Sequence, residues 1–180
     1  MVEIPPLLTP RLRLRGYRSD EFDAYAAMWS EAAVIRFIGG TPLPREAAWS
    51  RFLRQIGLWH HLGFGFFAVE DRETGAFIGE AGFHDLKRAI SPSIEGTMEA
   101  GWALVGAAQG RGLAEEAMRA ALDWAARHGT GERVTCIIHP EHTASLHVAG
   151  KLGFVAFGDG TYQGHPMTLL ERPRVPVTRS

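Results

Sequence analysis

The sequence has a single cysteine, no excess of charge of either sign and no long hydrophobic run. Cys136 alone excludes an internal disulfide framework and a zinc site built from cysteine pairs, which favours a reducing compartment. Nineteen Lys and Arg residues against 20 Asp and Glu give a net charge of −1, so no overall positive field exists to attract nucleic acid or an anionic membrane. The longest uncharged apolar passages, such as residues 100–108, are about half the roughly 20 residues that a membrane-spanning helix needs.

The first residues also lack the basic start, apolar stretch and small-residue cleavage site of a secretory signal. We therefore expect a cytoplasmic protein with neither a nucleic-acid nor a membrane partner. The 180 residues are 46% hydrophobic and 22% charged, which is typical of a chain that folds around one core. We expect one domain over residues 1–180, with its core at about 9–171, and find no internal repeat or low-complexity tract.

Hydrophobic patterning predicts alternating strands and helices. The expected strands are residues 11–17, 65–70, 76–83, 97–105, 133–138, 154–157 and 162–170, and the expected helices are 19–30, 45–62, 113–128 and 143–152. Residues 71–75 have the composition of a hairpin turn, and Gly158-Asp159-Gly160 is expected to turn the last hairpin. This order predicts an α/β (α+β) fold, in which helices pack on the faces of a mixed sheet.

A glycine-rich loop lies between an expected strand and the helix with the clearest apolar periodicity. It comprises Gln109, Gly110, Arg111, Gly112, Leu113 and Ala114. Its small residues allow a ligand to approach the backbone, and the free N–H groups of a helix's first turn favour negative charge, so a phosphate would fit here. No Lys-Ser/Thr pair follows the glycines and the pattern is not G-x-G-x-x-G, so nucleotide-binding loops of those kinds lose support. A plain tight turn is the alternative.

A second motif lies about thirty residues downstream of the glycine-rich loop, and the two motifs together resemble those of a known family. The loop pattern Gln109-x-x-Gly112-x-Ala114 resembles the CoA-pyrophosphate loop of the GNAT superfamily of N-acetyltransferases. Ala144-Ser145 followed by Lys151-Leu152-Gly153-Phe154 resembles that superfamily's second helix. The opening Thr9-Pro10-Arg11-Leu12-x-Leu14-Arg15 and Glu99-Ala100-Gly101-Trp102 resemble the branch that acetylates N-terminal amines of ribosomal proteins. The resemblance covers about residues 9–171.

The resemblance implies acetyl-CoA as the cosubstrate and a GNAT-like sheet, mostly antiparallel and splayed at a bulge in a central strand. It implies that main-chain N–H groups of residues 109–114, together with Glu115, hold the pyrophosphate. Backbone at Trp102, Ala103 and Leu104 would pair with the pantetheine arm like an added strand. The bulge would fall in residues 101–106, which contain two glycines. His142 stands where the family commonly has an Asn that contacts the cofactor.

The implied reaction transfers an acetyl group from a thioester to a neutral amine and requires no metal. Glu99 is the candidate that accepts the proton, directly or through water, with Glu80 and Glu95 as alternatives; a surface carboxylate on an edge strand is the structural alternative for Glu99. Many family members donate a proton to sulfur from a Tyr, but Ala149 occupies that position. Ser145 is the alternative donor, unless it only bonds the backbone at the start of its helix.

The acceptor is open among a protein N-terminus, a small amine and an amino acid. Residues that border or line its pocket by resemblance are His60, His61 and His84, with Trp49, Trp59, Phe64 and Phe66, although aromatic residues at these spacings are commonly core.

Two rival functions remain. One is a non-catalytic CoA-binding or sensing module, suggested by Ala149 and His142. The other is a metal enzyme built on His139, His142 and His147, which lack helical i, i+4 spacing. Sheet edges and the last hairpin are compatible with a homodimer.

Overall fold

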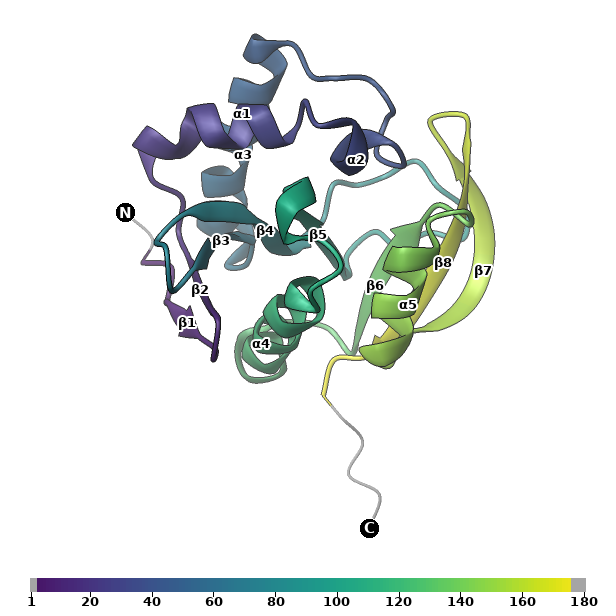
Figure 1. Cartoon of the computed structure of the whole chain (residues 1–180). Helices are drawn as coiled ribbons and strands as arrows, with labels where there is room; N and C mark the ends of the chain where they lie inside the picture. The colour runs from purple at the N-terminus through teal and green to yellow at the C-terminus, as the bar shows by residue number, and fades with distance from the viewer. Residues whose placement is uncertain (1–2, 176–180) are drawn as a thin grey trace.

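The computed structural model describes residues 3–175 and contains an eight-stranded sheet with helices around it (Figure 1). The strands are β1 Leu7–Leu8, β2 Leu12–Arg15, β3 Phe66–Asp71, β4 Phe77–His84, β5 Met98–Leu104, β6 Arg133–Ile138, β7 Val155–Tyr162 and β8 His165–Pro173. The helices are α1 Phe22–Met28, α2 Ala32–Ile35, α3 Arg45–Leu62, α4 Leu113–His128 and α5 Thr143–Lys151, with short 3₁₀ turns at Ser19–Glu21 and Gly106–Ala108. Within residues 3–175, no helix combines the length and apolar character that crossing a bilayer requires.

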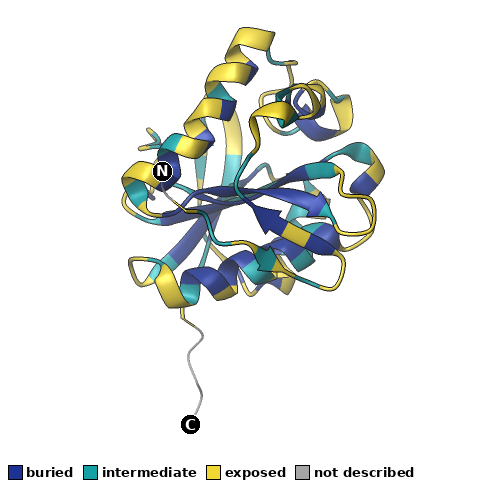
Figure 2. Ribbon diagram, turned by 90° about the vertical axis from the view of Figure 1, so that its left-hand side faces the viewer, coloured by how far each residue is buried: buried dark blue, intermediate teal, exposed yellow. Residues whose placement is uncertain are grey.

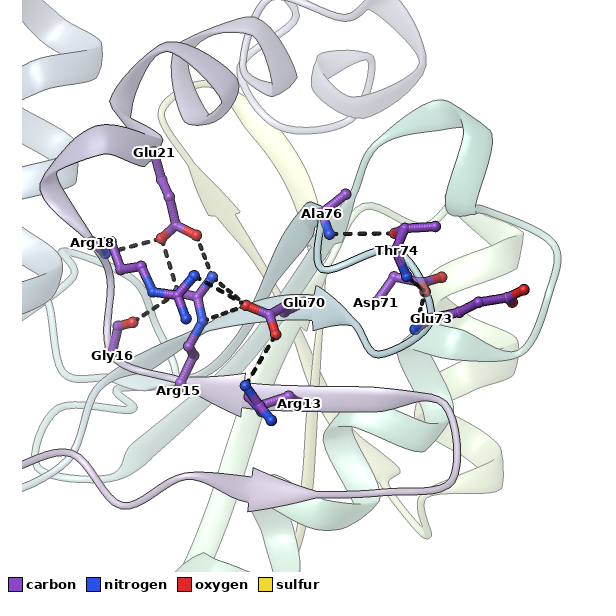
Figure 3. A network of polar contacts seen from close by, with 10 residues as sticks. All are labelled: Arg13, Arg15, Gly16, Arg18, Glu21, Glu70, Asp71, Glu73, Thr74 and Ala76. Atoms are coloured by element: carbon purple, nitrogen blue, oxygen red, sulfur yellow. Dashed lines mark hydrogen bonds and ion pairs between the residues drawn. The ribbon is translucent and has the colours of Figure 1, made fainter.

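The sheet is mixed and mostly antiparallel, as the sequence predicts. Its strand order is β1-β2-β3-β4-β5-β6-β8-β7, and β5 with β6 forms its parallel pair. The β3–β4 hairpin confirms the turn expected at residues 71–75: the Asp71 carboxylate accepts hydrogen bonds from the N–H groups of Glu73 and Thr74 (Figure 3). Gly75 closes this turn with a φ of +73°, a conformation that glycine adopts without steric cost.

The sheet divides between β5 and β6. From Glu99 to Leu104, β5 pairs with β4 in unbroken register, whereas it pairs with β6 only at Met98 and Glu99. The expected splay is therefore present, whereas the bulge expected in residues 101–106 is not seen in the β4–β5 pairing, which is regular from Glu99 to Leu104. At Gly101, a Cβ would lie 2.8 Å from the Phe66 ring, so the absence of a side chain allows the Phe66 ring of β3 to pack against β5.

The helices bury apolar residues against both faces of the sheet. In Figure 1, α1 and α3 lie above β3–β5 and α4 lies below them, and Figure 2 shows buried residues along the strands and the helix faces that meet them. The periodic residues of α4 are all buried, as predicted: Leu113, Ala117, Met118, Ala121, Leu122 and Ala125. A second cluster, which includes Tyr25, Trp29, Ile35 and Phe52, lies under α1–α3. Burying such side chains supplies most of the stability of a fold of this kind.

Three local predictions need correction. The core begins before residue 9, because β1 pairs with β2, and α2 was not expected. The last hairpin turns at Gln163-Gly164, whose φ angles are +51° and +81°, rather than at Gly158-Asp159-Gly160. Those two glycines lie inside β7, and a Cβ on Gly160 would sit 2.7 Å from the Ser91 carbonyl oxygen. The glycines therefore allow β7 to pack closely against the 85–97 loop. In the sequence alone, glycines that serve packing look the same as glycines that form a turn.

A buried ionic network fixes the start of the chain against β3 (Figure 3). The Arg15 guanidinium donates hydrogen bonds to both Glu21 and Glu70, and the Nε–Oε2 distance to Glu70 is 2.8 Å. Arg18 adds a backbone N–H to Glu21 at 2.9 Å. Burial disfavours the charged form of Glu21, but the hydrogen bonds from Arg15 and Arg18 outweigh it and hold the pKa of Glu21 below its ordinary value.

We predict that Glu21→Gln lowers the free energy of unfolding by about 1–3 kcal/mol near neutral pH, because a buried charged partner of Arg15 is lost. The folded-state pKa of Glu21 is depressed, so its stabilisation is complete above the unfolded pKa and is lost as the pH falls through the folded pKa. The difference between variant and wild type should therefore shrink on acidification. Urea unfolding over a pH series measures it, with Asp20→Asn, an exposed neighbour, as control. A difference that stays constant down to about pH 3 would contradict the ion-pair account.

Candidate active site

A cavity of 440 Å³ lies where β5 and β6 diverge. Its walls come from the α1–α3 region, from β4, β5 and β6, from the start of α5 and from the β7–β8 hairpin. This volume is within the range of small-molecule sites, about 300–1,000 Å³. The opening of the sheet thus creates a cleft with backbone edges, charged side chains and aromatic rings around it.

Glu99 lies in this cavity and is bound on two sides. Its Oε1 is 3.1 Å from Nε2 of His84, and the Nε of Arg88 donates to its Oε2 at 2.7 Å. The β4–β5 register places His84 directly opposite Glu99, and the Arg88 guanidinium lies over the Tyr162 ring at 4.5 Å. The side chain of Glu99 is only 6% exposed, so it is not a surface carboxylate.

The surroundings of Glu99 favour its charged form. Burial opposes ionisation, but the hydrogen bonds from His84 and Arg88 and the positive charge of Arg88 outweigh burial and lower the pKa of Glu99. A carboxylate with a depressed pKa accepts a proton weakly by itself. It is well suited to orient and stabilise a neighbouring imidazole that accepts the proton.

The two alternative carboxylates have different surroundings. Glu80 lines the cavity and is almost fully buried, with hydrogen bonds from the Tyr17 hydroxyl at 2.8 Å and the Gln55 amide at 3.0 Å, and Arg51 at 3.4 Å. It is therefore surrounded by donors belonging to the fold. Glu95 pairs with Lys87 on the exposed loop and is not among the residues that line the cavity.

Ser145 and His142 meet at the start of α5. The Ser145 Oγ lies 2.9 Å from Nε2 of His142, and the His142 ring stacks on Phe37 with centroids 4.6 Å apart. Burial and the neighbouring His139 lower the pKa of His142, which favours its neutral form. Ser145 thus bonds a side chain and not only backbone.

The metal alternative gains no support from these histidines. His139 also packs on Phe37, whereas His147 is exposed. Among residues 3–175, no group of three or more His, Cys, Asp or Glu side chains is placed to hold an ion.

The predicted phosphate loop leads from the end of β5 into α4. Gly110 and Gly112 have φ angles of +72° and +75°, and no side chain caps the N-terminus of α4, where Gly112 is the N-cap. The side-chain amide of Gln109 donates to the Leu104 carbonyl at 2.9 Å, which ties the loop to the strand. The first N–H groups of α4 therefore have no side-chain acceptor, which is the arrangement that binds anions.

The cations near this helix start are partly paired. Glu115 contacts Arg119 at 2.8 Å and Lys151 at 3.3 Å, and these contacts, chiefly that of Arg119, lower the pKa of Glu115. Arg111 is exposed, and its carbonyl accepts a hydrogen bond from Arg11 at 2.9 Å. Glu115 thus keeps two cations close to the loop.

The structure brings the predicted residues into two adjoining groups. Glu99, Trp102, Ala103, His142 and Ser145 line the cavity. Residues 109–115 form the exposed loop and first turn of α4, and Leu104 joins the two groups. Beyond Glu99, the edge of β5 that faces β6 has no strand partner in the described part of the chain.

Of the candidate pocket residues, His84 and Phe66 line the cavity, whereas His60 and His61 are exposed at the end of α3. The other aromatic candidates are elsewhere: Trp59 and Phe64 belong to the core, and Trp49 is 41% exposed.

Four arginines of the cavity were not predicted from the sequence, namely Arg36, Arg51, Arg54 and Arg88. The presence of Arg51 and Gln55 one turn apart, among apolar residues of α3, is the signal that this helix carries a polar, inward-facing strip.

Comparison with known proteins identifies relatives along most of the chain. Residues 11–155 match the family described as the acetyltransferase (GNAT) domain. Protein YkkB of Bacillus subtilis (strain 168) is 28% identical over 155 residues, which are 82% of this chain and 83% of that protein. A solved structure from Bordetella pertussis, described as a GNAT-family acetyltransferase, is 35% identical, covers 93% of this chain and 99% of its own, and superimposes with a TM-score of 0.83.

A more distant structure shares the fold. RimL, a ribosomal L7/L12 α-N-protein acetyltransferase solved in complex with coenzyme A, is 18% identical with a TM-score of 0.75. It covers 95% of this chain and 98% of its own.

Proposed function

The chain belongs to the GNAT acetyltransferase family, and we propose that it transfers an acetyl group from acetyl-CoA to a primary amine, by direct attack in a ternary complex. The observation that carries the proposal is the opening between β5 and β6. Beside it lie an unpartnered strand edge and the Glu99–His84 pair, and the chain then leads from β5 to α4, whose N-terminus has no side-chain cap. We further propose that residues 1–180 form one such domain.

The residues present fit acetyl-CoA in two places. N–H groups from the 109–112 loop and the first turn of α4, Leu113 to Glu115, would hold the diphosphate, since they have no side-chain cap and lie at the positive end of a helix dipole. The free edge at Trp102, Ala103 and Leu104 would pair with the amides of the pantetheine arm. When bound, acetyl-CoA supplies the acetyl group as a thioester, with a thiol as the leaving group.

His84 and Glu99 would accept the amine's proton together. If Nε2–H of His84 donates to Glu99, Nδ1 is left to take the proton, and the ionised Glu99 stabilises the imidazolium that forms. Arg88 keeps Glu99 ionised and fixes its position. This assigns proton acceptance to the pair, with Glu99 as its anionic member.

On the leaving side, Ser145 would hydrogen-bond the departing sulfur, and His142 orients the Ser145 hydroxyl. His142 would therefore act through Ser145 and Phe37 in place of the amide contact that the family's Asn makes. Ordinary thiols have a pKa of about 8.5, so a thiolate leaves with modest assistance and does not require the missing Tyr.

A covalent enzyme intermediate is not part of the proposal. Cys136 is the chain's only thiol, it is buried, and burial together with the charge of Glu99 raises its pKa far above the ordinary value. Its thiolate is therefore scarce at neutral pH. The proposal therefore has the amine attack the thioester directly.

The rival function is a CoA-binding or sensing module. It is favoured by Ala149, which is fully buried in the core and provides no donor at the position of the family's Tyr. Turnover discriminates between the two: release of free thiol with any member of an amine panel supports the enzyme, whereas cofactor binding without thiol release supports the sensor. Absence of binding to acetyl-CoA at millimolar concentration in calorimetry would contradict both.

We predict that Glu99→Gln and His84→Gln each lower kcat/KM by about 10²- to 10⁴-fold, the usual contribution of acid–base catalysis, without weakening acetyl-CoA binding. The wild-type rate should fall on acidification, because His84 and Glu99 can accept the amine's proton only while they do not already hold an extra one. Thiol release over a pH series measures both effects. Glu95→Gln, on the exposed loop, is the control and should match wild type. Full turnover in a folded Glu99→Gln variant would exclude Glu99 from the reaction.

We also predict that Gly112→Val weakens acetyl-CoA binding at least about 10-fold. The new side chain would strain the backbone at a positive φ and would obstruct the approach of the diphosphate to the anion-binding turn. Gly131→Val is the matched control: Gly131 has a φ of +76°, nearly equal to the +75° of Gly112, and a Cβ there would meet no atom within 4 Å. Both variants carry about 1–2 kcal/mol of backbone strain. Calorimetry should find a loss of affinity in Gly112→Val alone. Equal affinity in the two folded variants would contradict the loop's role.

A further inference from the structure

The cavity carries more positive than negative charge. Its lining includes four guanidinium groups, Arg36, Arg51, Arg54 and Arg88, and two carboxylates, Glu80 and Glu99. Each carboxylate already has a guanidinium partner, since Arg51 lies 3.4 Å from Glu80 and Arg88 lies 2.7 Å from Glu99. The other two arginines, Arg36 and Arg54, form no ion pair with a cavity carboxylate.

Arg51 and Arg54 differ in how they are held, although both face the cavity from α3. The Arg51 guanidinium lies 3.6 Å from the Trp29 ring centroid and donates to the Tyr25 hydroxyl at 3.2 Å. Arg54 makes no hydrogen bond or ion pair with any residue in the range 3–175. Partial burial, and after it the charge of Arg51, lower the pKa of Arg54.

Arg36 belongs to the same region. Its guanidinium lies 5.0 Å from the Phe37 ring centroid, and within residues 3–175 it too has no carboxylate partner. The positive charge thus gathers where α3 and the segment after α2 border the cavity.

The proposed diphosphate site does not account for this charge. Residues 109–115 are not among those that line the cavity, and they lead into α4, which lies below the strands in Figure 1, whereas α3 lies above the strands. Arg54, an exposed side chain, therefore borders the cavity and not the proposed diphosphate site.

We infer that the acceptor is an amine that carries a carboxylate, which Arg54 binds while the amine faces Glu99 and His84. The inference rests on the proposed acetyl transfer and narrows its substrate class. A guanidinium binds a carboxylate through two parallel hydrogen bonds, which fixes orientation as well as position. The same positive region repels polyamines and other polycationic acceptors. A free amino acid and a peptide whose first residues are acidic both present this chemistry.

The test compares matched acceptors by release of free thiol from acetyl-CoA. Each α-amino acid of a panel is paired with its carboxamide, which keeps the amine and removes the negative charge, and tripeptides with an acidic or a neutral second residue form a separate arm. The proteins are wild type, Arg54→Gln, Arg54→Lys and the control Arg127→Gln, an exposed arginine on α4. Calorimetry of the same acceptors with CoA-saturated protein gives a readout that does not need turnover.

We expect kcat/KM to be about 10- to 100-fold higher for the carboxylate member of a pair, as a charge-assisted hydrogen bond provides. Arg54→Gln should abolish that preference by raising KM with little change in kcat, Arg54→Lys should keep part of it, and Arg127→Gln should match wild type. Preference for acidic tripeptides over free amino acids would support the inference and identify a peptide as the source of the carboxylate.

Equal turnover of acids and carboxamides, or an unchanged preference in Arg54→Gln, would overturn the inference and leave acetyl transfer standing. Absence of thiol release with every amine would count against the proposed function, and calorimetry then decides the inference alone. Carboxylate binding that is lost in Arg54→Gln supports it. The inference is refuted if the acid and its carboxamide bind with equal affinity, or if wild type and Arg54→Gln bind the acid with equal affinity.

Discussion

The parting of β5 from β6 is the constraint on which the site depends. A strand inside a sheet normally satisfies its backbone groups on both sides, yet β5 does so with β4 along its length and with β6 only at Met98 and Glu99. The separation creates the cavity and leaves a row of peptide groups along it. The loop that follows β5 is tied to its end by the hydrogen bond from Gln109 to the Leu104 carbonyl, and this loop leads into the uncapped N-terminus of α4. A long ligand with amides and a diphosphate matches this arrangement.

Strand register and compensated charge then define the reactive end of the cavity. The β4–β5 register sets His84 against Glu99 and Glu80 beside Ala103. Both carboxylates are buried, a state that is costly for a charge unless hydrogen bonds and cations surround it. Arg88 and Arg51 provide those cations from a loop and from α3. The fold thereby holds two buried carboxylates in place, while Arg54 and Arg36 line the same cavity without a carboxylate partner in the described part of the chain.

Local patterns in the sequence predict a large part of this structure. The apolar periodicity of α4, the 71–75 turn and the glycine loop each depend on neighbouring residues, and the structure has each where it was expected. The last hairpin was misplaced because Gly160 serves contact with a distant loop at Ser91, which no local pattern records. Arg54 and Arg88 were not foreseen for a similar reason: one lies on a helix and one on a loop, and only tertiary packing brings both to Glu99's cavity. The resemblance made Glu99 a candidate, and its contacts with His84 and Arg88 became clear only from the strand register and the tertiary packing.

Amide hydrogen exchange at residues 100–104, with and without acetyl-CoA, tests the central claim most directly. Amides of β5 that face β4 are already bonded, so their exchange should not change, whereas those that face β6 should exchange rapidly in the free protein and slow markedly when the cosubstrate saturates the site. That result would show that the parted edge receives the ligand's amides. Saturation established by calorimetry, with no change in exchange anywhere in residues 100–104, would contradict the account.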